Sequence, residues 1–190
     1  MNVFYLHENP VTCAQMHLDK HASKMCVEYA QLMSTAHRVV DGNLWYGRTT
    51  NGRRIARYFH PDSVMNQSLY TACHINHPSN LWVRHSQDNY NWLYEMWTAL
   101  CAEYTHRYGR THESFRKLEY YLLIAPIKLE QKGFTQPPPA MKSHEHCIVK
   151  DDSITSYRNY YWEAKRDFAK WTRREPPQWW KERLLNERKG

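Results

Sequence analysis

Residues 10–40 constrain the fold most strongly, because their apolar side chains recur with the period of about 3.6 residues that marks one face of an α-helix. That face holds Leu18, Met25, Tyr29, Leu32, Met33 and Ala36. Asn9 and Pro10 supply a helix start, since asparagine caps a first turn and proline suits its first position. The Asp-Gly pair at 41–42 supplies an end. We therefore expect one long N-terminal helix over residues 10–40.

Comparable signals predict further helices. They cover residues 78–86, a long run after Ser86 that Gly109 closes, residues 112–125 and residues 154–173. Residues 3–6 are expected to be a strand or a buried arm, residues 126–150 an ordered surface loop, and residues 43–76 show no clear pattern. The chain is thus predicted to be mainly α, a compact single-domain helical fold over residues 1–175 with a long central helix and little strand. Residues 176–190 are expected to form a basic aromatic tail.

Charge and composition point to a nucleic-acid partner. Lys plus Arg outnumber Asp plus Glu by 26 to 19, and the chain carries 14 Tyr and 8 Trp. Basic surfaces attract the phosphate backbone, and aromatic rings stack on unpaired bases. Arginines 48, 53, 54 and 57 form a local basic cluster. We therefore expect a nucleic acid as the partner.

Cysteine usage and hydropathy predict a cytoplasmic protein, in the host cell if a phage encodes it. The five cysteines are scattered, with no C-x-x-C pair, as is typical of reduced proteins. No apolar run approaches the length that crosses a bilayer, so no membrane partner is expected. The first ten residues lack the charged and apolar regions of a signal peptide.

A polar stripe lies beside the apolar face of the first predicted helix. On a continuous helix it contains His17, His21, Lys24, Glu28, Gln31 and Thr35. Groups that border a core are partly desolvated, which is where pKa values move. The plain alternative is a solvated helix face with a Lys24–Glu28 contact one turn apart.

Two kinds of chemistry fit this stripe. His17 and His21 could share a metal ion, with Glu28 as an oxygen ligand, but the ammonium of Lys24 would repel the ion. The stripe could instead perform proton transfer, with Glu28 as the acid–base group and the basic side chains holding phosphates. We favour the second, and so predict no metal and no cofactor.

A second dense segment is "CHINHPSNLWVRHSQDNYNWL", residues 73–93. Asparagine and arginine recognise base edges and phosphates, and aromatic rings hold a displaced base. The predicted substrate-binding residues are His74, Asn76, His77, Asn80, Trp82, Arg84 and Asn89. The alternative is a loop-to-helix junction with an aromatic core.

Other motifs are weaker. "HEHC" offers His144, His146 and Cys147 as metal ligands. A basic group at a helix end, including His106 and Arg107, fits the helix dipole. No glycine-rich phosphate loop, G-x-S-x-G or zinc-finger spacing is present, so ATP-driven chemistry and serine hydrolysis have no support.

The segment "DKHASKMCVEYAQL" resembles part of the phage pyrimidine-dimer DNA glycosylases, the endonuclease-V-like base-excision enzymes. That family has an acidic residue, then a histidine and, seven positions later, its catalytic glutamate, a pattern matched by Asp19, His21 and Glu28. Residues 80–109 are similar to its long central helix, and the aromatic, basic C-terminal part is similar in character to its C-terminus. The chain also resembles uncharacterised phage proteins that share an H-x-D-K-H opening.

The resemblance implies a compact helical fold with the N-terminus near the first helix, and cleavage of a pyrimidine N-glycosidic bond. The family's terminal α-amine attacks the sugar C1′ to form an imine, and elimination then cuts the strand. Here Glu28 would be the acid–base residue, and the Met1 amine, or Lys24 if that amine is blocked, the nucleophile. His17 and His21 would orient the sugar-phosphate.

The chain departs from the family pattern at three positions. Asn2 follows Met1, where the family has a small residue that permits removal of methionine, and Val27 and Gln31 stand where the family has arginines. Two other hypotheses remain open. One is a metal-dependent enzyme built on the histidines and acting on a nucleotide or other small molecule. The other is a non-catalytic DNA-binding or host-interaction protein.

Overall fold

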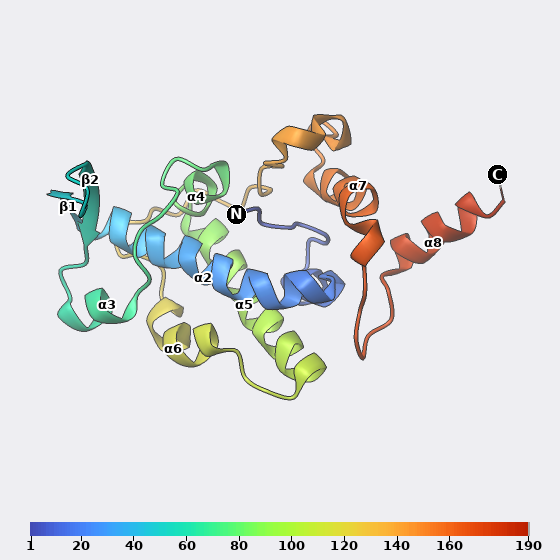
Figure 1. Ribbon diagram of the computed structural model, residues 1–190, viewed down its shortest axis with the longest axis horizontal. Coiled ribbons are helices and arrows are strands. Elements are labelled where there is room, and N and C mark those ends of the chain that lie inside the picture. The colour runs from blue at the N-terminus through green and yellow to red at the C-terminus, as the bar shows by residue number, and fades with distance from the viewer. Residues whose placement is uncertain (190) are drawn as a thin grey trace.

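The computed structural model describes residues 1–189, and its centre is a pair of long helices that pack against each other. These are α2, Asp19–Val40, and α5, Gln87–Tyr108. Figure 1 shows α2 in blue lying across α5 in green, with the other elements around them. The mainly α class with little strand, expected from the sequence, is confirmed.

The prediction of one helix over residues 10–40 is wrong, because the helix is broken at residues 17 and 18. Helix α1 spans Pro10–Met16 and α2 begins at Asp19. Leu18 between them is extended, with φ −69° and ψ 161°. The guanidinium of Arg107, from α5, donates to the main-chain oxygens of Gln15 and His17. These bonds replace helical ones that the break forfeits, so a residue distant in sequence stabilises it.

Three of the remaining helices are shorter than the ranges 78–86, 112–125 and 154–173 predicted from the sequence: α4, Pro78–Val83; α6, Glu113–Leu122; and α7, Ser153–Lys165, which the 3-10 turn η2, Arg166–Phe168, follows. Three further elements were not predicted: α3, Ser63–Ser68; α8, Gln178–Glu187; and the 3-10 turn η1, Lys142–Cys147, within the expected surface loop. The limits of α5 agree with its sequence signals. Ser86 Oγ accepts the Asp88 N–H at 3.1 Å, and Gly109 ends the helix at φ 71°.

A two-stranded antiparallel hairpin occupies part of the segment that showed no clear pattern. Strands β1, Asn43–Arg48, and β2, Arg54–Phe59, pair with Trp45 opposite Arg57. Both faces of the hairpin are largely exposed, so its sequence lacks the alternation that a half-buried strand shows. The hairpin stands at the C-terminal end of α2, and α8 lies at the opposite end of the molecule (Figure 1).

Residues 3–6 form a buried extended arm, the second of the two expected forms. The Phe4 N–H donates to the Tyr29 hydroxyl of α2, at 3.1 Å, and the Cys13 thiol donates to the Phe4 carbonyl. In the predicted C-terminal tail, α8 buries Trp180 against Trp171 and Trp162. Of the helices within residues 1–189, none combines the length and apolar character needed to cross a membrane.

Candidate functional site

Glu28 lies between two amino groups. Its Oε2 is 3.7 Å from the α-amine of Met1, and its Oε1 is 3.1 Å from Lys24 Nζ. The Glu28 side chain is 16% exposed, whereas that of Lys24 is 68% exposed and that of Met1 only 7%. The carboxylate therefore stands at the edge of the core, with one oxygen beside the N-terminal amine and the other beside the ammonium of an exposed lysine side chain.

The N-terminal arm reaches Glu28 because α2 binds it. Phe4 donates its N–H to Tyr29, the residue next to Glu28, and its ring stacks on the imidazole of His21 at 4.1 Å. Tyr29 in turn donates its O–H to His17 Nε2 at 2.9 Å, since His17 Nδ1–H is committed to the Cys13 carbonyl at 2.8 Å. This chain of buried hydrogen bonds fixes the arm and so places Met1.

The loop before α4, residues 69–77, carries two side chains whose pKa values respond to the charges of Glu28 and Met1. Burial lowers the pKa of His77, and the charge of the N-terminal amine lowers it further, while Glu28 acts in the opposite direction. Burial likewise raises the pKa of Cys73, which also responds to Glu28 and the amine. The charges of Met1 and Glu28 thus act on this loop as well as on each other.

The predicted substrate-binding residues divide into two groups. Asn80, Trp82 and Asn89 are buried, and Arg84 is partly buried, whereas His74 and Asn76 are exposed and His77 is half-buried. The buried amide of Asn80 donates to the Cys73 and His74 carbonyls, both at 3.0 Å, and Arg84 Nη2 donates to the Ile75 carbonyl at 2.7 Å. Asn80 and Arg84 therefore hold the loop, and the exposed residues are what the loop presents.

Trp82 and Asn89 instead fix a more distant segment. The Trp82 indole donates to the Thr135 carbonyl at 2.8 Å. Asn89 donates to the Trp82 carbonyl at 3.0 Å and accepts the Thr135 N–H at 2.8 Å. Their polar atoms are occupied within the protein, which leaves the loop residues as the members of the predicted set that face solvent.

His17 and His21 are buried, and both are neutral at pH 7. Burial lowers the pKa of His17 to about 4 and that of His21 to about 2. His21 Nδ1 hydrogen-bonds the hydroxyl of Tyr161 in α7 at 2.7 Å. The structure does not bring His17 to the face of α2 that carries Glu28, because the helix break turns it into the core. Neutral imidazoles add no positive charge for a phosphate, so their contribution here is to hold the arm and α7.

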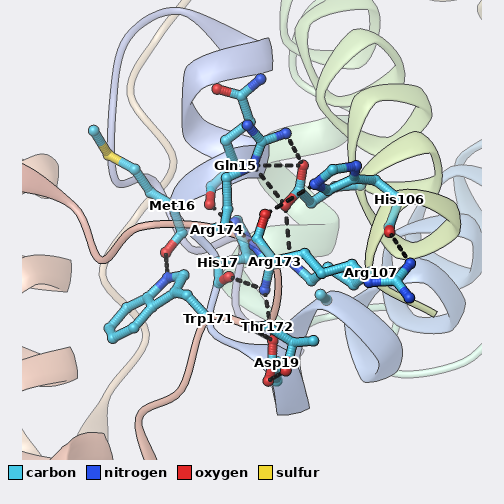
Figure 2. Close-up of polar contacts among 12 residues, drawn as sticks. Gln15, Met16, His17, Asp19, His106, Arg107, Trp171, Thr172, Arg173 and Arg174 are labelled. Carbon is cyan, nitrogen blue, oxygen red and sulfur yellow. Dashed lines mark hydrogen bonds and ion pairs between the residues drawn. The ribbon is translucent and has the colours of Figure 1, made fainter.

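Asp19, part of the pattern shared with the glycosylases, belongs to a separate ion-pair network shown in Figure 2. Its carboxylate accepts from the N–H and the hydroxyl of Thr172, at 2.9 and 2.7 Å, and pairs with Arg107 Nη1 at 3.0 Å. Arg107 also binds Glu103, which binds Arg174. Asp19 therefore joins the start of α2 to α5 and to residues 171–174.

The structure forms two clusters of side chains that could bind a metal, and the sequence did not predict the composition of either one. One joins His37, Asp41 and His60, and the other His146, Cys147 and Glu163. The His37–Asp41 spacing of one helical turn is visible in the sequence, but the approach of His60 is not. In the second cluster Glu163 takes the place expected for His144, whose ring packs against Tyr160 at 5.0 Å instead.

Comparisons with protein-family models, with curated proteins and with solved structures give no match for this chain. We therefore infer the function from the geometry around Glu28 and from the sequence resemblance.

Proposed function

We propose that this protein is a DNA glycosylase with a lyase step, which excises a damaged or modified pyrimidine by attack of an amine on the sugar C1′. The observation that carries the proposal is the placement of two amino groups against the two carboxylate oxygens of Glu28, at 3.7 and 3.1 Å. An amine nucleophile needs a neighbouring group that takes its proton, and a partly buried carboxylate is suited to that task.

In the proposed reaction the amine forms a bond to C1′ while the bond from C1′ to the pyrimidine breaks. The base leaves with the electron pair and takes up a proton. Glu28 accepts the proton that the amine loses and returns it to the ring oxygen as the sugar opens, which leaves an imine. Loss of a proton from C2′ then expels the 3′ phosphate and cuts the strand.

The resemblance favours Met1 over Lys24 as the nucleophile. The Met1 α-amine belongs to the arm that Tyr29 fixes through the Phe4 N–H, whereas the Lys24 ammonium ends a side chain that is 68% exposed. A solvated ammonium such as that of Lys24 is better suited to contact a phosphate. His77, whose pKa responds to the charges of Glu28 and the Met1 amine, would then contact the base or the sugar.

The hairpin supplies support for DNA as the partner. Its four arginines, 48, 53, 54 and 57, are exposed, as are the rings of Trp45 and Tyr46, which are 57% and 52% accessible. A basic two-stranded ribbon with aromatic side chains fits a polyanion that carries stacked bases. The net charge of +7 acts in the same direction.

The test compares two glutamate substitutions in a base-release assay on DNA that contains pyrimidine lesions and modified pyrimidines. Glu28→Gln removes the proton acceptor and should lower the rate at least 100-fold, the order typical of general acid–base catalysis, with the melting temperature nearly unchanged. Glu113→Gln is the matched control, because that side chain is 75% exposed and forms only a surface pair with Arg116. Full activity in Glu28→Gln would refute the proposal.

A further inference from the structure

A second site lies at the far end of α2 from Lys24, and it goes beyond the proposed glycosylase. His37 and Asp41 occupy successive turns of α2 and its C-cap, and His60 follows strand β2. One potential ligand atom from each of the three lies within 4.8 Å of the other two. Since a helix rises about 1.5 Å per residue, His37 is about 14 Å along α2 from Glu28, so the two sites are separate.

The hydrogen bonds of His37 leave a buried lone pair without a donor. Tyr90 donates its O–H to the Leu122 carbonyl at 3.0 Å, so its oxygen can only accept from His37 Nε2, at 2.9 Å. The proton of the neutral ring is therefore on Nε2, and Nδ1 is unprotonated. Within the described residues Nδ1 is buried and has no hydrogen-bond partner. A buried acceptor of this kind is costly unless an ion or a donor meets it.

Asp41 adds a buried negative charge beside that lone pair. The residue is 8% exposed, and among residues 1–189 its carboxylate forms no ion pair. Two main-chain N–H groups orient it instead, from Ile127 at 2.8 Å and Lys128 at 3.0 Å, and each oxygen keeps a free lone pair. Buried carboxylates are usually paired with a cation or bound to a metal. Outer hydrogen bonds of this type are what hold metal-ligating carboxylates in place.

His60 completes the set. Its Nδ1 accepts the Asp62 N–H at 3.2 Å, so Nε2 is the nitrogen left for a metal. Binding at Nε2 moves the ring proton to Nδ1 and breaks that hydrogen bond. This is a small change, because the bond is long and lies within one turn of the chain.

The three side chains also line a cavity of about 400 Å³. Its other walls are mainly apolar and include Val64, Met65, Tyr121 and Ile124. An ion held by three protein ligands keeps at least one coordination position open, and here the cavity provides the space for a ligand at that position.

We propose that His37 Nδ1, the Asp41 carboxylate and His60 bind one divalent transition-metal ion, with an open position that faces the apolar cavity. Two imidazoles and one carboxylate suit zinc and the other late first-row divalent ions. The ion would link the end of β2 to α2. The ligand at the open position would be water or a small molecule with a metal-binding donor atom and an apolar body.

The experiment is zinc titration of the metal-stripped full chain by calorimetry, with cobalt absorption as a second measurement. We expect one zinc per chain, and binding at least 100-fold weaker in His60→Ala. His60 is only half-buried, so this variant should fold, which circular dichroism checks. The control His85→Ala removes an exposed histidine outside the cluster and should bind zinc as the unmodified chain does.

Two results would overturn the proposal. One is the absence of stoichiometric zinc binding, and the other is binding unchanged in His60→Ala. Loss of zinc in Glu163→Gln, with retention in His60→Ala, would assign the ion to the second cluster instead. Glu28→Gln should bind zinc normally, so failure of the glycosylase proposal and failure of the metal proposal can be told apart.

Discussion

Replacement of Asp19 tests whether the carboxylate shared with the glycosylase pattern stabilises the fold or takes part in the chemistry. Asp19→Ala removes three contacts: those to the Thr172 N–H at 2.9 Å, the Thr172 hydroxyl at 2.7 Å and Arg107 Nη1 at 3.0 Å. All three hold residues 171–174 and α5 against the start of α2. The structure therefore predicts loss of stability.

The size of the stability loss depends on the ion pair that Arg107 retains after Asp19 is removed. Removal of one partner from a buried ion pair costs about 3–5 kcal/mol, since the other charge is left without compensation. Arg107 retains Glu103 at 2.7 Å, and Asp19 is 16% exposed, so water reaches part of the vacated space. We therefore expect about 3 kcal/mol, at the lower end of that range. For a chain of this size, that corresponds to a fall of about 6–12 °C in melting temperature.

Calorimetry and urea unfolding measure this difference, and Glu113→Ala is the control. Glu113 is 75% exposed and its pair with Arg116 is a surface one, so its loss should change stability by no more than about 0.5 kcal/mol. If Asp19→Ala melts within 2 °C (about the effect of 0.5 kcal/mol) of the unmodified protein but has lost base release, Asp19 belongs to the reaction and the structural assignment is wrong.

Three further predictions concern the arm, the buried histidines and the hairpin. Tyr29→Phe leaves the Phe4 N–H without its acceptor, so the free energy of unfolding should fall by about 2–3 kcal/mol and activity should be lost. The control Tyr120→Phe alters a side chain that is 82% exposed and should change neither stability nor activity. Normal melting of Tyr29→Phe would contradict the role given to Tyr29. Burial lowers the pKa of His17 from 6.5 to about 4, so the unfolded chain takes up this proton at a higher pH than the folded chain does. The stability that His17 contributes is therefore complete above pH 6.5 and is lost as the pH falls toward 4, with a loss of about 2 kcal/mol at pH 5. Urea unfolding that is independent of pH would contradict this. Arg57→Ser should reduce the slope of log affinity for DNA against log salt by about 0.9 if the hairpin contacts phosphate, and an unchanged slope would exclude that contact.

The sequence alone predicts the limits of those elements whose ends are fixed by hydrogen bonds to neighbouring residues. The limits of α5 could be predicted because Ser86 and Gly109 cap it through bonds to adjacent turns. The break between α1 and α2 could not, since Arg107, about 90 residues away, provides its main-chain hydrogen bonds. The hairpin was missed because its two exposed faces leave no alternation of apolar and polar residues.

The same division applies to the sites. The Lys24–Glu28 contact follows from spacing on one helix, and in the sequence analysis it belonged to the alternative of a solvated helix face. The approach of the Met1 amine to Glu28 was implied only by the resemblance, because it depends on the hydrogen bonds of Phe4 and Tyr29. The cluster of His37 with His60 depends on the path of the hairpin, which spacing alone does not reveal.

Borohydride trapping tests the proposed amine attack, because an imine between an amine and C1′ is reduced to a permanent protein–DNA bond. The substrate is DNA that contains a damaged or modified pyrimidine, treated with and without a chelator. We expect a trapped complex that survives chelation, is absent in Glu28→Gln, and maps by peptide sequencing to Met1 or, if that amine is blocked, to Lys24. Base release without any trapped complex, or activity that is lost on chelation and restored by one metal, would contradict it.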